Sequence, residues 1–380
     1  MSNFIETYKE GQLGKSFGLD TGIPALNQAI NGLQKKQSIG LAAAPKVGKT
    51  TLCDFAFVIN PYLQMEALGK LDDVEWIYFS GEIDRVSKEF KFAAFFMAHD
   101  YKVYSIPYKG KVYPMSSNYL QGKLQHRNPD DTTEMVPVSP EHFEMLRDIY
   151  ARRIIPLFGE YSDKGVKLKS GKIIFIENLE NPTGLNKYLW TYAKMNGYFV
   201  EETYKVFDTE KNDVVDRKRI VGYVPNNPDK YVIIITDHIR KLKRERGFSM
   251  KENIDKWLEY STELRNWCKF TYIHIIHSNR NLANVERLKY AGEWVFPTAD
   301  DCKDSGNPAE ECTIFMTLFN PNDEKYSLKR HFGVDLDNNK APYYRSLHIT
   351  ESRDTECPSH IQLNMYGGVN MFTPFMYKTT

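Results

Sequence analysis

Residues 43–50, Ala-Ala-Pro-Lys-Val-Gly-Lys-Thr, constrain the fold of this chain more than any other segment, and they follow an apolar run at residues 38–42. A short apolar strand that turns through a Pro/Gly loop into Gly-Lys-Thr is typical of a phosphate-binding loop. The backbone N–H groups of such a loop surround a polyphosphate at a helix N-terminus, where the helix dipole also favours negative charge. Because Ala43 occupies the place of the usual first glycine, the alternative is an ordinary strand-to-helix turn.

In a phosphate-binding loop the lysine reaches the β- and γ-phosphates, and the hydroxyl residue after it ligates Mg²⁺. The sequence assigns these roles to Lys49 and Thr50, and it predicts ATP and Mg²⁺ as cofactors. The residues expected to surround the nucleotide are Ala43, Ala44, Pro45, Lys46, Val47, Gly48, Lys49, Thr50 and Thr51.

The composition excludes several classes of protein. The chain has 380 residues, of which 42% are hydrophobic and 26% charged, as in an ordinary globular protein. The net charge of +1 creates no overall field toward nucleic acid, so any such contact must come from a local patch. The five scattered cysteines form no Cys-x-x-Cys pair, which predicts reduced thiols. Without an apolar leader or a run of 18 apolar residues, we expect a cytoplasmic protein with no membrane contact.

Strand-like apolar runs alternate with helical patterns, which predicts an α/β fold with a mainly parallel central sheet flanked by helices. Buried strands are expected at residues 39–43, 76–79, 173–176, 231–235 and 272–276. A more antiparallel C-terminal edge is expected from residues 313–318, 346–350 and 360–364. Helices are expected at residues 50–58, 86–97, 183–195 (with Thr183 as N-cap) and 253–268.

Two stretches, at about residues 100–138 and 200–230, break this alternation. The first is rich in Tyr, Pro, Lys and Ser and has no helical period, and the second resembles a β-hairpin with a polar tip near residues 209–213. Long additions on a protein surface cost little free energy. We therefore expect both stretches to be insertions carried on the surface of the core.

Carboxylates follow two of the predicted strands. Glu82 comes just after the second strand, which we expect beside the phosphate-loop strand, and a carboxylate there can orient and deprotonate the attacking water. Asp237 ends the run Tyr-Val-Ile-Ile-Ile-Thr-Asp, where a buried parallel strand can deliver a carboxylate to Mg²⁺. The alternative for each is a solvated residue at the end of a strand.

Histidines mark the next strand. His277 stands at its tip, where it can contact the γ-phosphate, and the alternative is a structural histidine at a strand end. His274 lies within the strand and is expected to be a core residue whose ring is hydrogen-bonded.

Basic residues gather in the loops that follow Asp237 and His277. The densest group follows Asp237, and it is either a solvated face or a contact for nucleic-acid phosphates. The basic residues of the two loops are Arg240, Lys241, Lys243, Arg244, Arg246, Arg280, Arg287 and Lys289. Arg353 lies beyond the strand expected at residues 346–350, where its guanidinium is placed to serve the nucleotide of a neighbouring subunit.

In this order along the chain, the segments resemble one family: the RecA-like motor domain of DnaB-type replicative helicases and the related phage primase-helicases. Residues 18–33 resemble the family's lead-in to its phosphate-binding loop, which often begins with Ala and has Pro at the third place. Residues 79–82, Phe-Ser-Gly-Glu, resemble its Ser-Leu-Glu-Met. Residues 301–306, Asp-Cys-Lys-Asp-Ser-Gly, resemble its Asp-Leu-Arg-x-Ser-Gly.

The resemblance implies a RecA-like P-loop NTPase core at residues 18–380, after a short N-terminal segment at residues 1–17. Lys49, Glu82, His277 and Arg353 then take the catalytic roles, with Glu82 as base, His277 as sensor and Arg353 as a finger that acts on the adjacent subunit of a ring. The metal ligands are Thr50 and Asp237. The resemblance further implies that the basic residues of the loops after Asp237 and His277 contact single-stranded DNA. It also implies a hexamer-like ring of identical subunits, and a primase or loader as partner. It would place a phage-encoded protein in the host cytoplasm.

The sequence also departs from the family. The lysine usually found two residues before the finger is replaced by Glu351, the family's N-terminal domain is not expected, and the two insertions have no family counterpart. Two functions therefore remain open. The first is an ATP-driven ring helicase or translocase on single-stranded DNA. The second is a RecA-like nucleotide-binding switch, assembly or recombination-accessory protein without motor activity.

Overall fold

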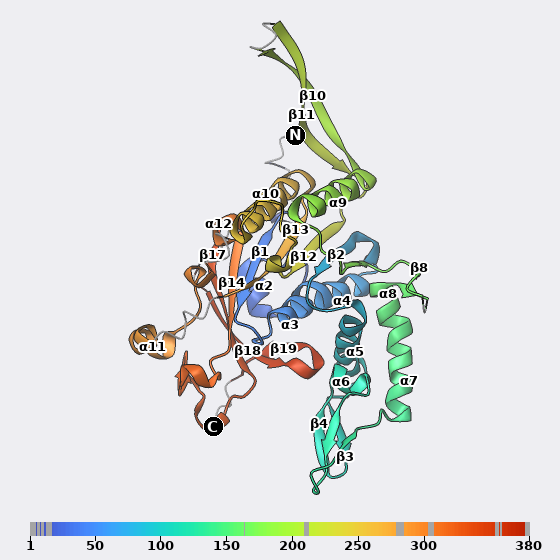
Figure 1. The fold of residues 1–380 in the computed structure, drawn as a ribbon, viewed down its shortest axis with the longest axis vertical. Helices are drawn as coiled ribbons and strands as arrows, with labels where there is room; N and C mark the ends of the chain where they lie inside the picture. Colours follow the sequence, from blue (N-terminus) through green and yellow to red (C-terminus); the bar gives the residue numbers. More distant parts are fainter. Residues whose placement is uncertain are drawn as a thin grey trace.

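The structure of the protein, a computed structural model, describes residues 17–162, 164–208, 213–278, 285–302, 308–353 and 359–376, with positions 5, 8, 11, 12 and 357. Helices cover both faces of a large central sheet, as Figure 1 shows. The sheet has the strand order β19-β18-β17-β14-β1-β13-β12-β2-β9. The strands from β14 to β9 in this order are parallel, and those from β17 to β19 are added antiparallel. The predicted α/β fold with a mainly parallel sheet is confirmed.

The strands coincide with the apolar runs of the sequence, because strands with helices on both faces must be apolar throughout. In chain order they are β1 (Ser38–Ala43), β2 (Val74–Ser80), β9 (Ile173–Ile176), β12 (Tyr231–Asp237), β13 (Thr271–His277), β14 (Ile314–Phe319), β17 (Tyr344–Ser352), β18 (Ser359–Tyr366) and β19 (Met371–Pro374). The sequence analysis did not predict the edge strand β19.

Successive side chains of each parallel strand enter two different cores, because side chains alternate across a sheet. On β13, Ile273 and Ile275 pack with the helices α2 to α5, whereas Tyr272 and Ile276 pack with α9 and α10. These helices are α2 (Pro24–Ile30), α3 (Lys49–Asp54), α4 (Asn60–Ala67), α5 (Arg85–Tyr101), α9 (Pro182–Met195) and α10 (Met250–Cys268).

Several helical boundaries differ from the predictions. A π-helical turn, Phe55–Ile59, joins α3 to α4, so the helical segment after the phosphate-binding loop continues to Ala67. The predicted N-cap of α9 was wrong: Asn181, and not Thr183, accepts the backbone N–H of Gly184. The helices α7 (Pro140–Ile149) and α8 (Ile155–Phe158) were not predicted.

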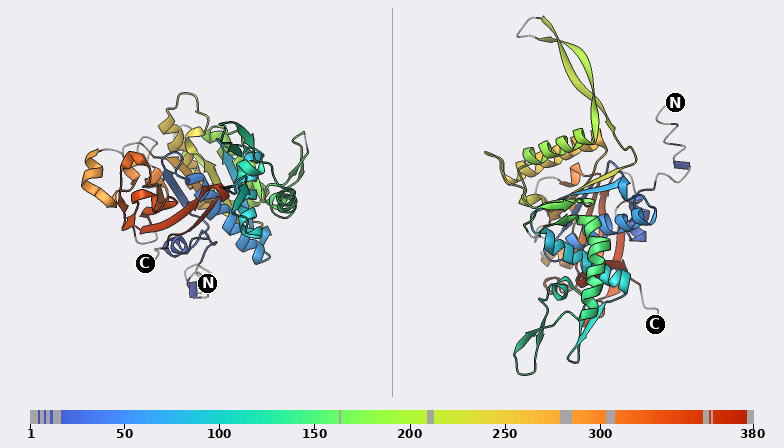
Figure 2. Two further views of the ribbon diagram at one scale, coloured as in Figure 1. Left: turned by 90° about the horizontal axis from the view of Figure 1, so that it is seen from below. Right: turned by 90° about the vertical axis from the view of Figure 1, so that its right-hand side faces the viewer.

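The stretches predicted as insertions form hairpins at opposite ends of the molecule (Figure 2). Strands β10 (Gly197–Asp208) and β11 (Asp213–Pro225) form one long hairpin, whose predicted polar tip lies mostly outside the described residues. The other end carries β3 (Ser105–Tyr108) with β4 (Lys111–Pro114), α6 (Ser117–Leu120), and β5 (Gln125–Arg127) with β6 (Thr133–Met135).

The first insertion does not lie wholly on the surface, contrary to the expectation. Met115 and Val136 are buried, and both belong to the apolar core that contains α5. Within the described residues, no helix is long and apolar enough to cross a membrane.

Candidate nucleotide-binding and catalytic site

The phosphate-binding loop lies between β1 and α3 at the C-terminal edge of the parallel strands. Gly48 is the N-cap of α3 and has φ 111°, a backbone conformation that glycine adopts without strain. A Cβ at this position would lie 2.4 Å from Sδ of Met365 on β18, so a larger residue would also have to displace the end of that side chain. Ala43, in the place of the usual first glycine, is the last residue of β1 and is buried.

A cation from the antiparallel edge supports this loop, and the sequence analysis missed it. The side chain of Arg345, on β17, donates from Nε to the carbonyl oxygen of Val47 at 3.2 Å. Burial lowers the pKa of Arg345 to about 10, so the guanidinium stays charged at neutral pH. No local motif marks this arginine, because β17 reaches the loop only through the order of strands in the sheet.

Parallel strands end at the same edge, and the register brings the predicted residues together there. Ala43 is the pairing partner of His277, and Asp237 is the pairing partner of Ser80. Glu82 follows β2, where the backbone N–H of Gly81 donates to the carbonyl oxygen of Asp237 at 2.7 Å. The expected neighbour relation was wrong, since β13 and β12 separate β2 from β1.

The side chains of Lys49 and Thr50 lie near the carboxylates at the C-terminal edge of the sheet. Lys49 is buried, and its Nζ lies 3.2 Å from Nδ1 of His277. Burial lowers the pKa of Lys49, while the carboxylates of Glu82 and Asp237 oppose that shift. The hydroxyl of Thr50 donates to Oδ1 of Asp237 at 3.3 Å. A hydroxyl and a carboxylate that face each other behind a phosphate-binding loop form a suitable donor set for Mg²⁺.

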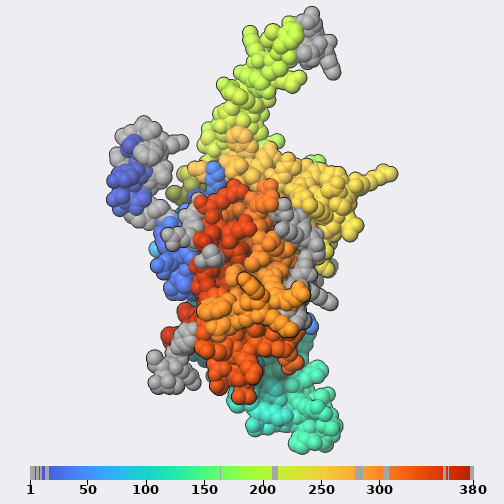
Figure 3. Space-filling model, turned by 90° about the vertical axis from the view of Figure 1, so that its left-hand side faces the viewer, coloured from blue at the N-terminus to red at the C-terminus, as the bar shows by residue number. Residues whose placement is uncertain are grey.

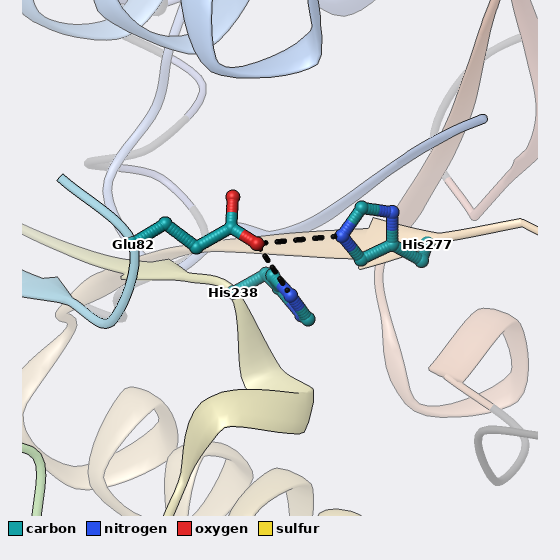
Figure 4. A group of neighbouring side chains, drawn as sticks. All are labelled: Glu82, His238 and His277. Atoms are coloured by element: carbon teal, nitrogen blue, oxygen red, sulfur yellow. Dashed lines mark ion pairs between the residues drawn. The ribbon is translucent and has the colours of Figure 1, made fainter. Parts of the chain in front are cut away.

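Glu82 lies between two imidazole rings, drawn in Figure 4. Its Oε1 is 3.1 Å from Nε2 of His238 and 3.7 Å from Nε2 of His277. Burial lowers the pKa of His238 to about 3, and burial together with Lys49 lowers the pKa of His277, so both rings are neutral at pH 7. The sequence analysis missed His238, although it directly follows Asp237.

The hydrogen bonds at the far side of each ring determine where its proton lies. Nδ1 of His238 accepts the backbone N–H of Arg240 at 3.3 Å, and Nδ1 of His277 faces the ammonium group of Lys49. A neutral imidazole carries one proton, so each ring presents Nε2–H to Glu82. Nε2 of His238 lies within hydrogen-bond distance of the carboxylate, whereas Nε2 of His277, at 3.7 Å, makes a longer polar contact.

The same three side chains also have the composition of a metal site. The ligand atoms of Glu82, His238 and His277 lie within 4.8 Å of one another. A metal would need an unprotonated Nε2 on both rings, whereas the hydrogen bonds at Nδ1 place the proton on Nε2. We therefore assign this cluster to the positioning of Glu82 and not to metal binding.

His274 is fully buried on β13, as predicted for a core residue, but neither ring nitrogen has a hydrogen-bond partner among the residues that the structure describes. The expectation that its ring is hydrogen-bonded was therefore wrong. Burial lowers the pKa of His274 to about 3, so the ring is neutral.

The basic residues after Asp237 are exposed. In Figure 3 this segment is the yellow projection, and α11 (Val285–Ala291) contributes to the orange surface. Lys243 forms an ion pair with Glu180 at 3.4 Å. Among the described residues, no carboxylate forms an ion pair with the other four cations of the segment, which are Arg240, Lys241, Arg244 and Arg246.

The remaining candidate DNA contacts differ in whether their side chains already form contacts within the protein. Arg287, on α11, donates to Oδ1 of Asp301 at 2.6 Å and to the carbonyl oxygen of Phe296 at 2.8 Å, so its guanidinium is occupied within the protein. Lys289 is exposed. Arg280 lies outside the described residues, as does the segment at residues 303–307.

Arg353 lies at the sheet edge opposite the phosphate-binding loop. Its backbone N–H donates to the carbonyl oxygen of Thr313, ahead of β14, and its Nη2 donates to the carbonyl oxygen of Glu310 at 2.7 Å. Ile39, at the start of β1, pairs with Ile314. Since a strand rises about 3.3 Å per residue, most of the length of β1 separates Arg353 from the loop of its own subunit.

The fold has counterparts among solved structures. The ATPase domain of G40P superposes with a TM-score of 0.63 and 13% sequence identity, covering 98% of this chain and 97% of that one. A DnaB-like replicative helicase, solved in a study of its interactions with primase, gives a TM-score of 0.63 and 13% identity over 99% of this chain and 68% of the other. The sequence matches no protein-family profile and no curated protein. The chain therefore has the fold of the ATPase domain of DnaB-like helicases, as the sequence predicted.

Proposed function

We propose that this chain is an ATP-driven helicase or translocase that acts as a ring on single-stranded DNA. One observation carries the proposal: the C-terminal edge of the sheet brings Lys49, Thr50, Glu82, Asp237 and His277 into a single constellation behind a phosphate-binding loop. The likeness in fold to the ATPase domain of a DnaB-like helicase supports the assignment of this constellation to ATP hydrolysis.

Each side chain has a definite task in this proposal. Lys49 binds the β- and γ-phosphates, and the carboxylate of Glu82 orients and deprotonates the attacking water. His238 and His277 flank Glu82, with their Nε2 atoms 3.1 Å and 3.7 Å from its Oε1, which restricts the direction of the carboxylate. Thr50 and Asp237 would hold Mg²⁺, which supplies charge compensation on the phosphates when it is bound.

The ring belongs to the proposal because Arg353 is remote from its own phosphate-binding loop. A guanidinium on the opposite edge of the sheet can complete the site of an adjacent subunit, where it stabilises charge on the transferred phosphoryl group. The four cations after Asp237 that form no ion pair within the described part of the chain would contact the phosphates of the strand. A primase is proposed as a further partner, since the solved DnaB-like helicase was studied with one.

Strand displacement tests the proposal. A fluorescent oligonucleotide annealed to a longer strand with a single-stranded tail is incubated with the protein, ATP and Mg²⁺. We expect ATP-dependent release of the labelled strand, and no release by Lys49→Ala. A protein that binds ATP and the tailed substrate but neither separates the strands nor moves along the tail would contradict a motor. That result would instead identify a nucleotide-binding switch.

A further inference from the structure

A buried network of charged and polar side chains lies directly beneath Asp237. Lys88, on α5, is fully buried, and its Nζ lies 3.0 Å and 2.9 Å from the two carboxylate oxygens of Asp54. The same ammonium group donates to the phenolic oxygen of Tyr78 at 2.8 Å. The three N–H donors of Lys88 therefore have three acceptors, as a buried ammonium group requires.

The network extends to the carboxylate that we assign to Mg²⁺. The hydroxyl of Tyr78 lies 3.3 Å from Oδ2 of Asp237 and 3.1 Å from Oδ1 of Asp54. A phenol has one proton to donate. Both oxygens of Asp54 already accept from Lys88, so the acceptor that most needs this proton is Oδ2 of Asp237. The other oxygen, Oδ1, then stays directed at Thr50.

The four members of this network come from four of the elements that surround the nucleotide site. Asp54 ends α3, the first helical segment after the phosphate-binding loop, and Asp237 ends β12. Tyr78 lies on β2 and Lys88 on α5, and Glu82 lies in the loop that joins these two elements. The network thus connects the loop, the base and the metal carboxylate beneath the surface of the site.

We propose that Tyr78 is a positioning residue for the metal site, and that its hydroxyl, held by the Asp54–Lys88 pair, orients the carboxylate of Asp237 toward Thr50. The inference rests on the proposed nucleotide site. Hydrogen-bond partners of metal ligands tune metal affinity, and their loss typically weakens it by about 10- to 100-fold.

Tyr78→Phe removes the hydroxyl that faces Asp237 and keeps the ring that stacks on Phe175 at 5.3 Å. It also takes one of the three acceptors from Lys88, so the test is read on protein shown to be folded. The measurement is equilibrium binding of a fluorescent, non-hydrolysable ATP analogue at increasing Mg²⁺. We expect the Mg²⁺ concentration for half-maximal enhancement of binding to rise about tenfold, while analogue affinity in EDTA stays unchanged. Bound Mn²⁺, followed by electron paramagnetic resonance with the same analogue, gives a second measurement that needs no turnover.

Tyr62→Phe is the matched control. Tyr62 is fully buried on α4, and its hydroxyl donates to a carboxylate oxygen of Glu66 at 3.3 Å, so the same atom is lost from a similar bond away from the site. The control should show the wild-type dependence on Mg²⁺. Unchanged Mg²⁺ and Mn²⁺ affinity in folded Tyr78→Phe would overturn the inference and leave a structural role only. Failure of the wild-type protein to bind the analogue would overturn the proposed function instead.

Discussion

Glu82 illustrates how single residues are controlled in this site. The carboxylate projects from the loop after β2, with Nε2 of His238 3.1 Å and Nε2 of His277 3.7 Å from its Oε1, and burial keeps the pKa of both rings low, so the rings are uncharged at neutral pH. Two rings beside the carboxylate restrict its direction, and a general base must be directed at the water that it deprotonates. The arrangement fits a general base better than a phosphate-binding group.

Glu82→Gln separates these two roles. We expect the variant to keep its affinity for ATP and to lose turnover by about 10²-fold or more, because a base acts only after the nucleotide is in place. Nucleotide binding and steady-state hydrolysis are measured on the same preparation. Glu89→Gln serves as the control, because Glu89 lies nearby on α5 but forms an ion pair with Arg85. Parallel loss of binding and turnover in Glu82→Gln would identify Glu82 as structural.

The sequence predicted the residues whose roles depend on local pattern. Lys49 and Thr50 follow from the loop, and Asp237 follows from the apolar strand that ends in it. His238 and Arg345 were missed, because their contacts depend on which strands are neighbours in the sheet. The proposed roles of these residues remain predictions.

At the scale of elements, the antiparallel edge contains a cluster of histidines that responds to acid. His348 on β17 lies directly opposite His360 on β18, with ring centroids 4.8 Å apart, and His331 packs beside them. Burial lowers the pKa of His331 and His360 to about 4, and lowers that of His348 well below its usual range. The folded edge therefore requires neutral rings.

We expect the free energy of unfolding to fall as the pH drops from about 6.5, where histidines of the unfolded chain gain protons. The loss should continue toward pH 4, where the folded rings begin to protonate. Urea unfolding at pH 7.5 and pH 5 measures this change in the free energy of unfolding. His360→Phe, whose ring would still pack on Phe332, should reduce the pH dependence. Equal stability at both pH values would contradict this account.

The segment after β12 gives a second prediction at this scale. Replacing Arg240, Lys241 and Arg244 with Ala should flatten the dependence of log K on log salt for single-stranded DNA, by about 0.7 for each phosphate contact that is lost. Affinity for ATP should not change. The control variant changes the net charge equally, because it removes three exposed cations that are already paired with carboxylates: Arg127, Arg147 and Lys218. The same slope in both triple variants would mean that the segment is a solvated face.

Elements were predicted where burial leaves a pattern in the sequence. The strands β1, β2, β9, β12 and β13 are apolar runs, and their positions in the sequence agree with the structure to within a few residues. The position of β2 in the sheet was wrong, because strand order is set by packing between segments distant in sequence. The π-helical turn and the buried part of the first insertion likewise leave no periodic signal.

At the scale of the whole molecule, Lys49 and Arg353 lie at opposite ends of the parallel strands, and in the proposed ring a complete site would need two subunits. Arg353→Ala keeps the loop and lacks the finger, whereas Lys49→Ala keeps the finger and lacks the loop lysine. We expect a mixture of the two variants to hydrolyse ATP faster than the sum of the separate preparations. Native mass measured on the mixture should show an oligomer. Absence of complementation, or an active monomer, would contradict action between subunits.

The most direct test of the central claim is the steady-state rate of ATP hydrolysis measured as single-stranded DNA is added at low salt. A motor built on this site should hydrolyse ATP faster as DNA is added, until the rate reaches a plateau, and Lys49→Ala should remain inactive throughout. A wild-type protein that binds ATP but hydrolyses it at the same rate, or not at all, with and without DNA would contradict the motor assignment.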